Sequence, residues 1–131
     1  MARQPQSLDD LPANAVRPLG TLSAETLRAW TQAAGQRFIW ADLDALTERK
    51  ALLKAIGRAF EFPQWYGANL DALYDCLTDL PDRNGPVGYV IVLDGLPSGE
   101  ARENAESVLD VFRDAAEEFA RNGIAMRVFY R

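Results

Sequence analysis

The chain has 131 residues, of which 48% are hydrophobic and 25% are charged. This composition is typical of one soluble globular domain with a core of useful size. The chain contains no histidine and a single cysteine, Cys76. With one cysteine, an internal disulfide is impossible. Histidine is the commonest general acid or base near neutral pH and the commonest metal ligand, so its absence removes both roles. We expect a protein that is not an enzyme and that holds no metal or cofactor.

The charge balance is 14 basic against 19 acidic residues, a net charge of -5. Such a protein repels phosphate backbones, so we expect no nucleic-acid binding, whereas a basic protein partner is favoured. Solubility alone is the other explanation of a modest net charge. No apolar run approaches the roughly 20 residues of a membrane helix, and residues 1–10 lack the apolar core of a secretion signal. We therefore expect a cytoplasmic protein.

Hydrophobic periodicity divides the chain into an N-terminal segment and an alternation of strands and helices. Residues 1–22 contain three prolines without clear periodicity and are predicted to be an extended or loosely packed arm. Ser23 can cap a short helix that ends near Ala34. The other predicted elements are strands at 37–41, 89–93 and 124–130 and helices at 47–60, 69–80 and 104–122. This alternation predicts an α/β fold with a parallel sheet.

The predicted helix at 69–80 carries an acidic row. Asp71, Asp75 and Asp79 are four residues apart, and Tyr74 projects near them. Like charges at this spacing cost a few tenths of a kcal/mol per pair. Only Asp71 lies near the positive end of the helix dipole, and no Lys or Arg occurs in residues 59–82. The row is either a solvated face or a surface kept for a partner.

The predicted helix at 104–122 carries a second acidic row on the side away from Phe112 and Phe119. Its members are Asp110, Asp114, Glu117 and Glu118. Arg113 and Arg121 partly offset their charge, so a solvated face is the stronger explanation here. If the two helices are neighbours, both rows could converge on one surface.

Trp65, Tyr66 and Gly67 precede the first acidic helix. Aromatic residues in such a loop either anchor a binding surface or pack into the core, and we expect Tyr66 to be the more buried of the two. Gly67 is expected to allow the tight turn into the helix. Cys76 lies on the apolar side of that helix, which predicts a buried, inert thiol.

Two stretches of the chain resemble the barstar (barnase inhibitor) family. The first is Pro63 to Thr78 (PQWYGANLDALYDCLT), and the second is Asn104 to Arg113 (NAESVLDVFR). They occur in the family's order, with a strand between them and a strand after them. The resemblance implies a three-stranded parallel sheet packed with helices over residues 36–131. Residues 1–35, an arm plus a short helix, would then be an N-terminal extension.

The resemblance also implies a function. Members of this family plug the active site of a barnase-type ribonuclease with an acidic helix, whose carboxylates occupy the places of substrate phosphates. This chain would then be a monomeric bacterial antitoxin that blocks a basic ribonuclease. By position, Asp75 matches the central carboxylate of the family and Asp71 its supporting acid. The partner-binding residues implied in this way are Trp65, Gly67, Asn69, Asp71, Tyr74, Asp75, Asp114 and Glu118.

The rim of this surface departs from the family pattern. Trp65 stands where the family has Tyr, Tyr74 and Leu80 stand where it has Trp, and Asp114 stands where it has Glu. These departures put the identity of the partner in question more than the mode of action. Two alternatives remain open, namely a binding or immunity module for a different basic toxin or protein, and a carboxylate-based, metal-dependent hydrolase.

Overall fold

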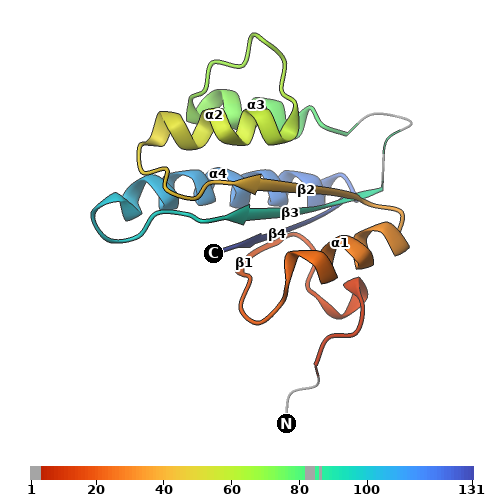
Figure 1. Cartoon of the computed structure of the whole chain (residues 1–131). Helices are drawn as coiled ribbons and strands as arrows, with labels where there is room; N and C mark the ends of the chain where they lie inside the picture. The colour runs from red at the N-terminus through yellow and green to blue at the C-terminus, as the bar shows by residue number, and fades with distance from the viewer. Residues whose placement is uncertain (1–3, 82–84, 86) are drawn as a thin grey trace.

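The computed structural model describes residues 4–81, 85 and 87–131. At its centre lies a four-stranded parallel sheet in the order β1-β4-β3-β2. Helix α1 covers one face of the sheet, and α2, α3 and α4 cover the other (Figure 1). The strands are β1 (Ala15–Pro18), β2 (Arg37–Asp42), β3 (Gly88–Asp94) and β4 (Ala125–Tyr130), and the helices are α1 (Ala24–Ala33), α2 (Arg49–Phe60), α3 (Leu70–Thr78) and α4 (Arg102–Arg121). Two short 3-10 turns, at Leu8–Asp10 and Gly99–Ala101, complete the described elements.

The apolar sequence of the central strand β3 follows from a sheet that is covered on both faces. Its side chains alternate, as they do in any strand. Tyr89, Ile91 and Leu93 join the core under α2, α3 and α4, while Val90 and Val92 join a smaller core under α1. All five are fully buried. The almost wholly apolar sequence of this strand is thus the consequence of burial on two sides.

The fourth strand corrects the prediction of a three-stranded sheet and of a loosely packed arm. β1 lies within that arm and pairs in parallel with β4. Leu8, Leu11 and Leu19 are buried beside α1, and the Arg127 guanidinium donates a hydrogen bond to the Leu11 carbonyl at 3.2 Å. The strand has only four residues and ends at Pro18 on a sheet edge, where proline is tolerated. So short a strand leaves no periodic signal in the sequence.

Local signals position the helices much as predicted. The Ser23 hydroxyl accepts a hydrogen bond from the Thr26 amide and caps α1. Gly35 and Gly123 take the left-handed conformation after α1 and α4, with φ of 69° and 71°. Helix α3 ends at Thr78, two residues earlier than predicted. None of the helices in the described part of the chain combines the length and apolar character that a membrane crossing requires.

Candidate functional site

The loop from Phe62 to Asn69 joins α2 to α3 and is anchored by Tyr66. The Tyr66 hydroxyl donates a hydrogen bond to the Leu53 carbonyl at 3.0 Å, and its ring packs edge-on against Phe62 with centroids 5.0 Å apart. Burial, followed by the nearby Cys76, raises the pKa of Tyr66 to about 12. Trp65 is 69% exposed. The prediction that Tyr66 is the more buried of the two aromatic residues is confirmed.

The turn into α3 contains a left-handed residue next to Gly67. Ala68, and not Gly67, has positive φ, at 49°. A Cβ atom at position 67 would lie 3.0 Å from the Asn69 side-chain amide nitrogen, so glycine serves here to let Asn69 approach. The Asn69 side-chain oxygen in turn accepts a hydrogen bond from the Ala72 amide at 2.8 Å and caps α3. Gly67 and Asn69 therefore determine where the acidic helix begins.

The acidic rows of α3 and α4 meet at one surface. An open hollow of about 530 Å³ lies between the two helices and is lined by Leu70, Asp71, Tyr74, Asp75, Val111 and Asp114. The three aspartates are exposed, and Tyr74 is half-buried against the core. We name this surface the acidic hollow. It brings together four of the eight predicted partner-binding residues.

The carboxylates of the acidic hollow have no counter-ion among the residues that the structure describes. Neither Asp71, Asp75 nor Asp114 makes a side-chain ion pair or hydrogen bond with the other described residues. The nearby cations of α4 are engaged with other acids. Arg113 pairs with Asp110 at 2.7 Å and with Glu106 at 3.6 Å. Arg121 pairs with Glu118 at 2.7 Å.

Glu118 consequently differs from the other predicted acids. Its hydrogen bonds from Arg121 and Asn122 lower the pKa of its carboxyl group and tie the side chain to the end of α4. Of the second acidic row, Asp114 lines the hollow with a free carboxylate, whereas Asp110 and Glu118 are neutralised by arginines. Arg113 and Arg121 thus offset part of the second acidic row, as the sequence indicated, and leave Asp114 in the hollow.

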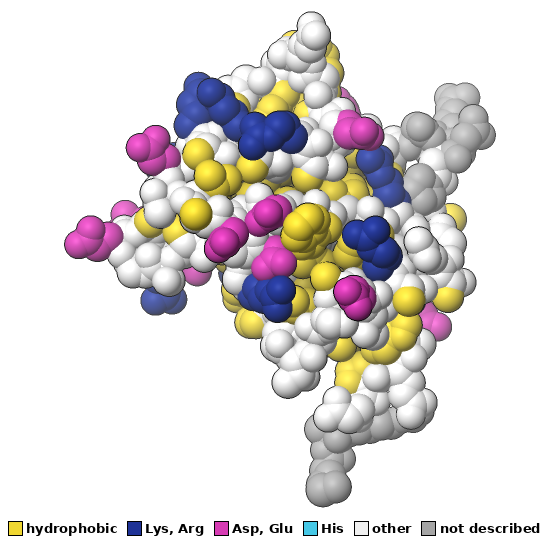
Figure 2. Space-filling model, viewed as in Figure 1, with side chains coloured by type: hydrophobic (Ala, Val, Ile, Leu, Met, Phe, Trp, Pro, Cys, Tyr) yellow, Lys and Arg dark blue, Asp and Glu magenta, His cyan; other side chains and the backbone are white. Residues whose placement is uncertain are grey.

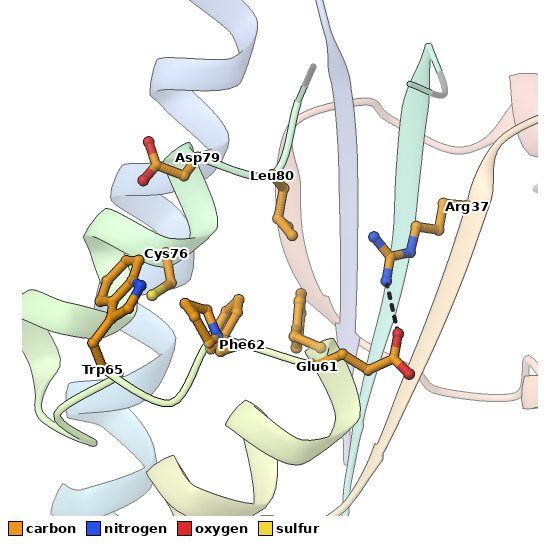
Figure 3. Close-up of a pocket in the computed structure, with 9 residues that line it drawn as sticks. Arg37, Glu61, Phe62, Trp65, Cys76, Asp79 and Leu80 are labelled. Atoms are coloured by element: carbon orange, nitrogen blue, oxygen red, sulfur yellow. Dashed lines mark ion pairs between the residues drawn. The ribbon is translucent and has the colours of Figure 1, made fainter. Parts of the chain in front are cut away.

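Trp65 lies on the other side of α3. With Cys76, Asp79 and Leu80 it lines a second hollow, of about 340 Å³, in which the indole lies near the thiol and Asp79 (Figure 3). Asp79 caps the C-terminus of α3 and belongs to this hollow, not to the acidic one. Cys76 is 3% exposed, which confirms the predicted buried thiol, and burial together with Asp79 and Asp75 raises its pKa.

Sequence reasoning missed one residue that shapes this region. A Cβ atom at Gly57 of α2 would lie 2.6 and 2.8 Å from two ring carbons of Tyr66. Glycine is thus required for the ring to lie on the helix. A glycine inside an otherwise apolar-striped helix is a signal of close approach, and it could have been used. Within the described ranges, no group of three or more candidate ligand side chains is arranged to hold a metal ion.

The fold and the acidic hollow together define a small α/β protein in which α3 and α4 present unpaired carboxylates to solvent. The family model described as "Barstar (barnase inhibitor)" matches residues 36–131. This chain therefore belongs to the barstar family. Residues 1–35, which include β1 and α1, lie outside the match.

A curated relative agrees with this assignment. The chain is 40% identical over 58 residues to a protein of Bacillus subtilis (strain 168) named "Putative ribonuclease inhibitor YrdF". The aligned part covers 44% of this chain and 62% of that relative. The chain thus spans somewhat less than two thirds of the relative's length.

Proposed function

We propose that this protein binds and inhibits a ribonuclease of the barnase type, as an inhibitor and not as an enzyme. The observation that carries the proposal is the acidic hollow, in which Asp71, Asp75 and Asp114 face solvent without a counter-ion among the described residues. A ribonuclease binds a chain of phosphates and must present cations to it. Three carboxylates on two adjacent helices offer such an enzyme an imitation of its substrate's charge.

The hydrogen-bond pattern supports a preformed surface. Asn69 fixes the start of α3, and Tyr66 ties the preceding loop to α2. A surface that is already ordered loses little conformational entropy on binding, so more of the interaction energy appears as affinity. In this proposal Asp75 enters the enzyme's catalytic pocket, with Asp71 and Asp114 beside it. Trp65, Gly67, Asn69, Tyr74 and Glu118 complete the contact surface.

The name of the Bacillus subtilis relative and membership of the barstar family both point to ribonuclease inhibition. Trp65 and Leu80, which depart from the family pattern, both line the 340 Å³ hollow beside α3, and Trp65 is exposed. This altered edge of the contact surface favours a target that is related to barnase and not identical to it. The proposal places the inhibitor in the cytoplasm, where it would act as an antitoxin toward a ribonuclease of the same cell. A different basic toxin is the second candidate, favoured by the same unpaired carboxylates.

A competition assay tests the proposal. The full chain is titrated into a barnase-type ribonuclease, and residual cleavage of a fluorogenic RNA is followed. We expect stoichiometric inhibition, and we expect excess nucleotide 3′-phosphate to slow the binding of this protein to the ribonuclease, because both ligands occupy the phosphate sites. A binding rate that the nucleotide leaves unchanged would contradict occupation of these sites. Binding of basic proteins without any inhibition of ribonucleases would favour the second candidate.

A further inference from the structure

A row of cations on α2 lies beside the proposed contact loop and has no part in the proposed inhibition. Lys50, Lys54 and Arg58 are four residues apart and exposed, so they stack on one face of the helix. The described residues supply no ion pair to any of them. Like charges at this spacing oppose helix formation slightly. The row is unexpected on a chain whose net charge is -5.

These cations border a hollow of their own. Lys50, Lys54 and Arg58 line an open space of about 500 Å³ together with Tyr66 and Gly67 of the contact loop. We name it the basic hollow. Figure 2 shows Lys and Arg side chains gathered over α2 in the upper part of the molecule.

The acid nearest to the basic hollow is directed elsewhere. Glu61 is the single acid among its lining residues. Its carboxylate lies 4.0 Å from the Arg37 guanidinium, and both side chains line the 340 Å³ hollow at the end opposite Trp65 (Figure 3). The pair is exposed and weak, but its direction leaves the three cations of α2 without an internal counter-ion in the described structure.

The two charged hollows flank one loop. The acidic hollow begins at Leu70 and Asp71, and the basic hollow includes Gly67 and Ala68, only a few residues earlier in the chain. A partner that covers the loop would meet negative charge on one side and positive charge on the other. Complementary potentials of this kind determine the orientation of docking and the rate of association.

We propose that the basic hollow docks an acidic segment of the same partner protein whose cations engage the acidic hollow. This inference rests on the proposed function for the identity of the partner. It predicts a ribonuclease whose basic active site is bordered by Asp or Glu side chains. RNA fits less well as the occupant of the basic hollow, because the neighbouring carboxylates would repel its phosphates.

The first test is chemical cross-linking of oppositely charged side chains that are in contact. A zero-length carbodiimide links lysine amines to carboxylates that touch them, and it is applied to the complex with a ribonuclease that this protein inhibits. We expect mass spectrometry to find Lys50 or Lys54 linked to an Asp or Glu of the ribonuclease. Lys50 and Lys54 are the chain's two lysines, so links that join only ribonuclease lysines to acids of this chain, with neither Lys50 nor Lys54 linked, would overturn the proposal.

The second test measures association by stopped flow at low salt. Lys54→Glu should slow association about tenfold, since it reverses a charge at the docking surface. Arg17→Glu is the matched control, because it makes the same kind of charge reversal at an exposed residue far from α2. Arg17 lies on β1 at one edge of the sheet, whereas α2 packs against β2 at the other edge. It should change the rate less than twofold. Equal effects of both variants would show that net charge alone matters and would overturn the proposal.

A third test is independent of the proposed function. A fluorescent hexaglutamate peptide and a hexauridylate RNA are compared by anisotropy with the free protein. We expect the peptide to bind, and Lys50→Glu/Lys54→Glu to weaken its binding at least tenfold. Tighter binding of the RNA at the same residues, or no binding of the peptide, would refute the basic hollow as an acidic-segment site. Loss of inhibition in Asp75 variants addresses the proposed function separately.

Discussion

Gly57 is the position at which one added methyl group should show how the contact loop is held. In Gly57→Ala the new Cβ would lie 2.6 Å from the Tyr66 ring. The ring has little room to yield, because its hydroxyl is bonded to the Leu53 carbonyl and its edge packs against Phe62. Overpacking of this kind costs about 1–3 kcal/mol, and loss of the hydrogen bond costs about 1 kcal/mol more.

Helix propensity acts in the opposite direction. Alanine is favoured over glycine inside a helix by about 1 kcal/mol. We therefore expect Gly57→Ala to lower the free energy of unfolding by about 1–3 kcal/mol. For a chain of this length the melting temperature should fall by roughly 4–12 °C. Thermal and urea unfolding followed by circular dichroism measure the change.

A double-mutant cycle separates the two effects. In a Tyr66→Ala background the obstacle is absent, so Gly57→Ala should stabilise the protein by about 1 kcal/mol through propensity alone. The sign of the substitution's effect thus depends on residue 66. Stabilisation by Gly57→Ala in the otherwise unchanged protein, or an equal effect in both backgrounds, would refute the packing argument.

Three further outcomes follow from the same region. Asn69→Ala should lower the free energy of unfolding by about 1 kcal/mol, because alanine cannot cap α3. Asn69→Asp should lower it by much less, because aspartate can still cap the helix, and urea unfolding compares the two variants. Cys76, whose pKa is raised by burial and by Asp79 and Asp75, should react slowly with Ellman's reagent until denaturant is added, and rapid reaction of the native protein would contradict its burial. Since the pKa of Tyr66 is raised in the fold to about 12, its contribution to stability is complete below pH 10 and is lost between pH 10 and 12. Stability should therefore fall more steeply over that range than in Tyr66→Phe, and parallel curves would contradict the shift.

Much of the fold from residue 36 onward could be predicted, because its elements are long enough to show a period. The helix at 102–121 repeats buried apolar residues every three to four positions, and the strand at 88–94 is apolar throughout. β1 could not be found in this way. Four residues that end in proline carry no period, and their place in the sheet follows from pairing with β4, a partner more than 100 residues away.

The charges of the candidate site and their partial offset by arginines could be predicted, but not which individual acids the arginines pair with. The spacing of Asp71 and Asp75 places them on one helix face, and the structure brings Asp114 to the same hollow. Which acids keep a free carboxylate depends on where Arg113 and Arg121 point, and rotamers are not encoded in spacing. The contact of Gly57 with Tyr66 and the basic row beside the loop likewise depend on the path of the chain between α2 and α3.

The proposed role of Asp75 in inhibition is tested by the inhibition constant of Asp75→Ala against a barnase-type ribonuclease, compared with that of Asp110→Ala. Asp110 is a matched control because its carboxylate is exposed but already paired with Arg113, outside the acidic hollow. Removing one partner of a buried charge pair costs about 3–5 kcal/mol, so Asp75→Ala should weaken inhibition at least about 100-fold. Asp110→Ala should change inhibition by less than about threefold. Full inhibition by Asp75→Ala, or equal losses in both variants, would contradict the account.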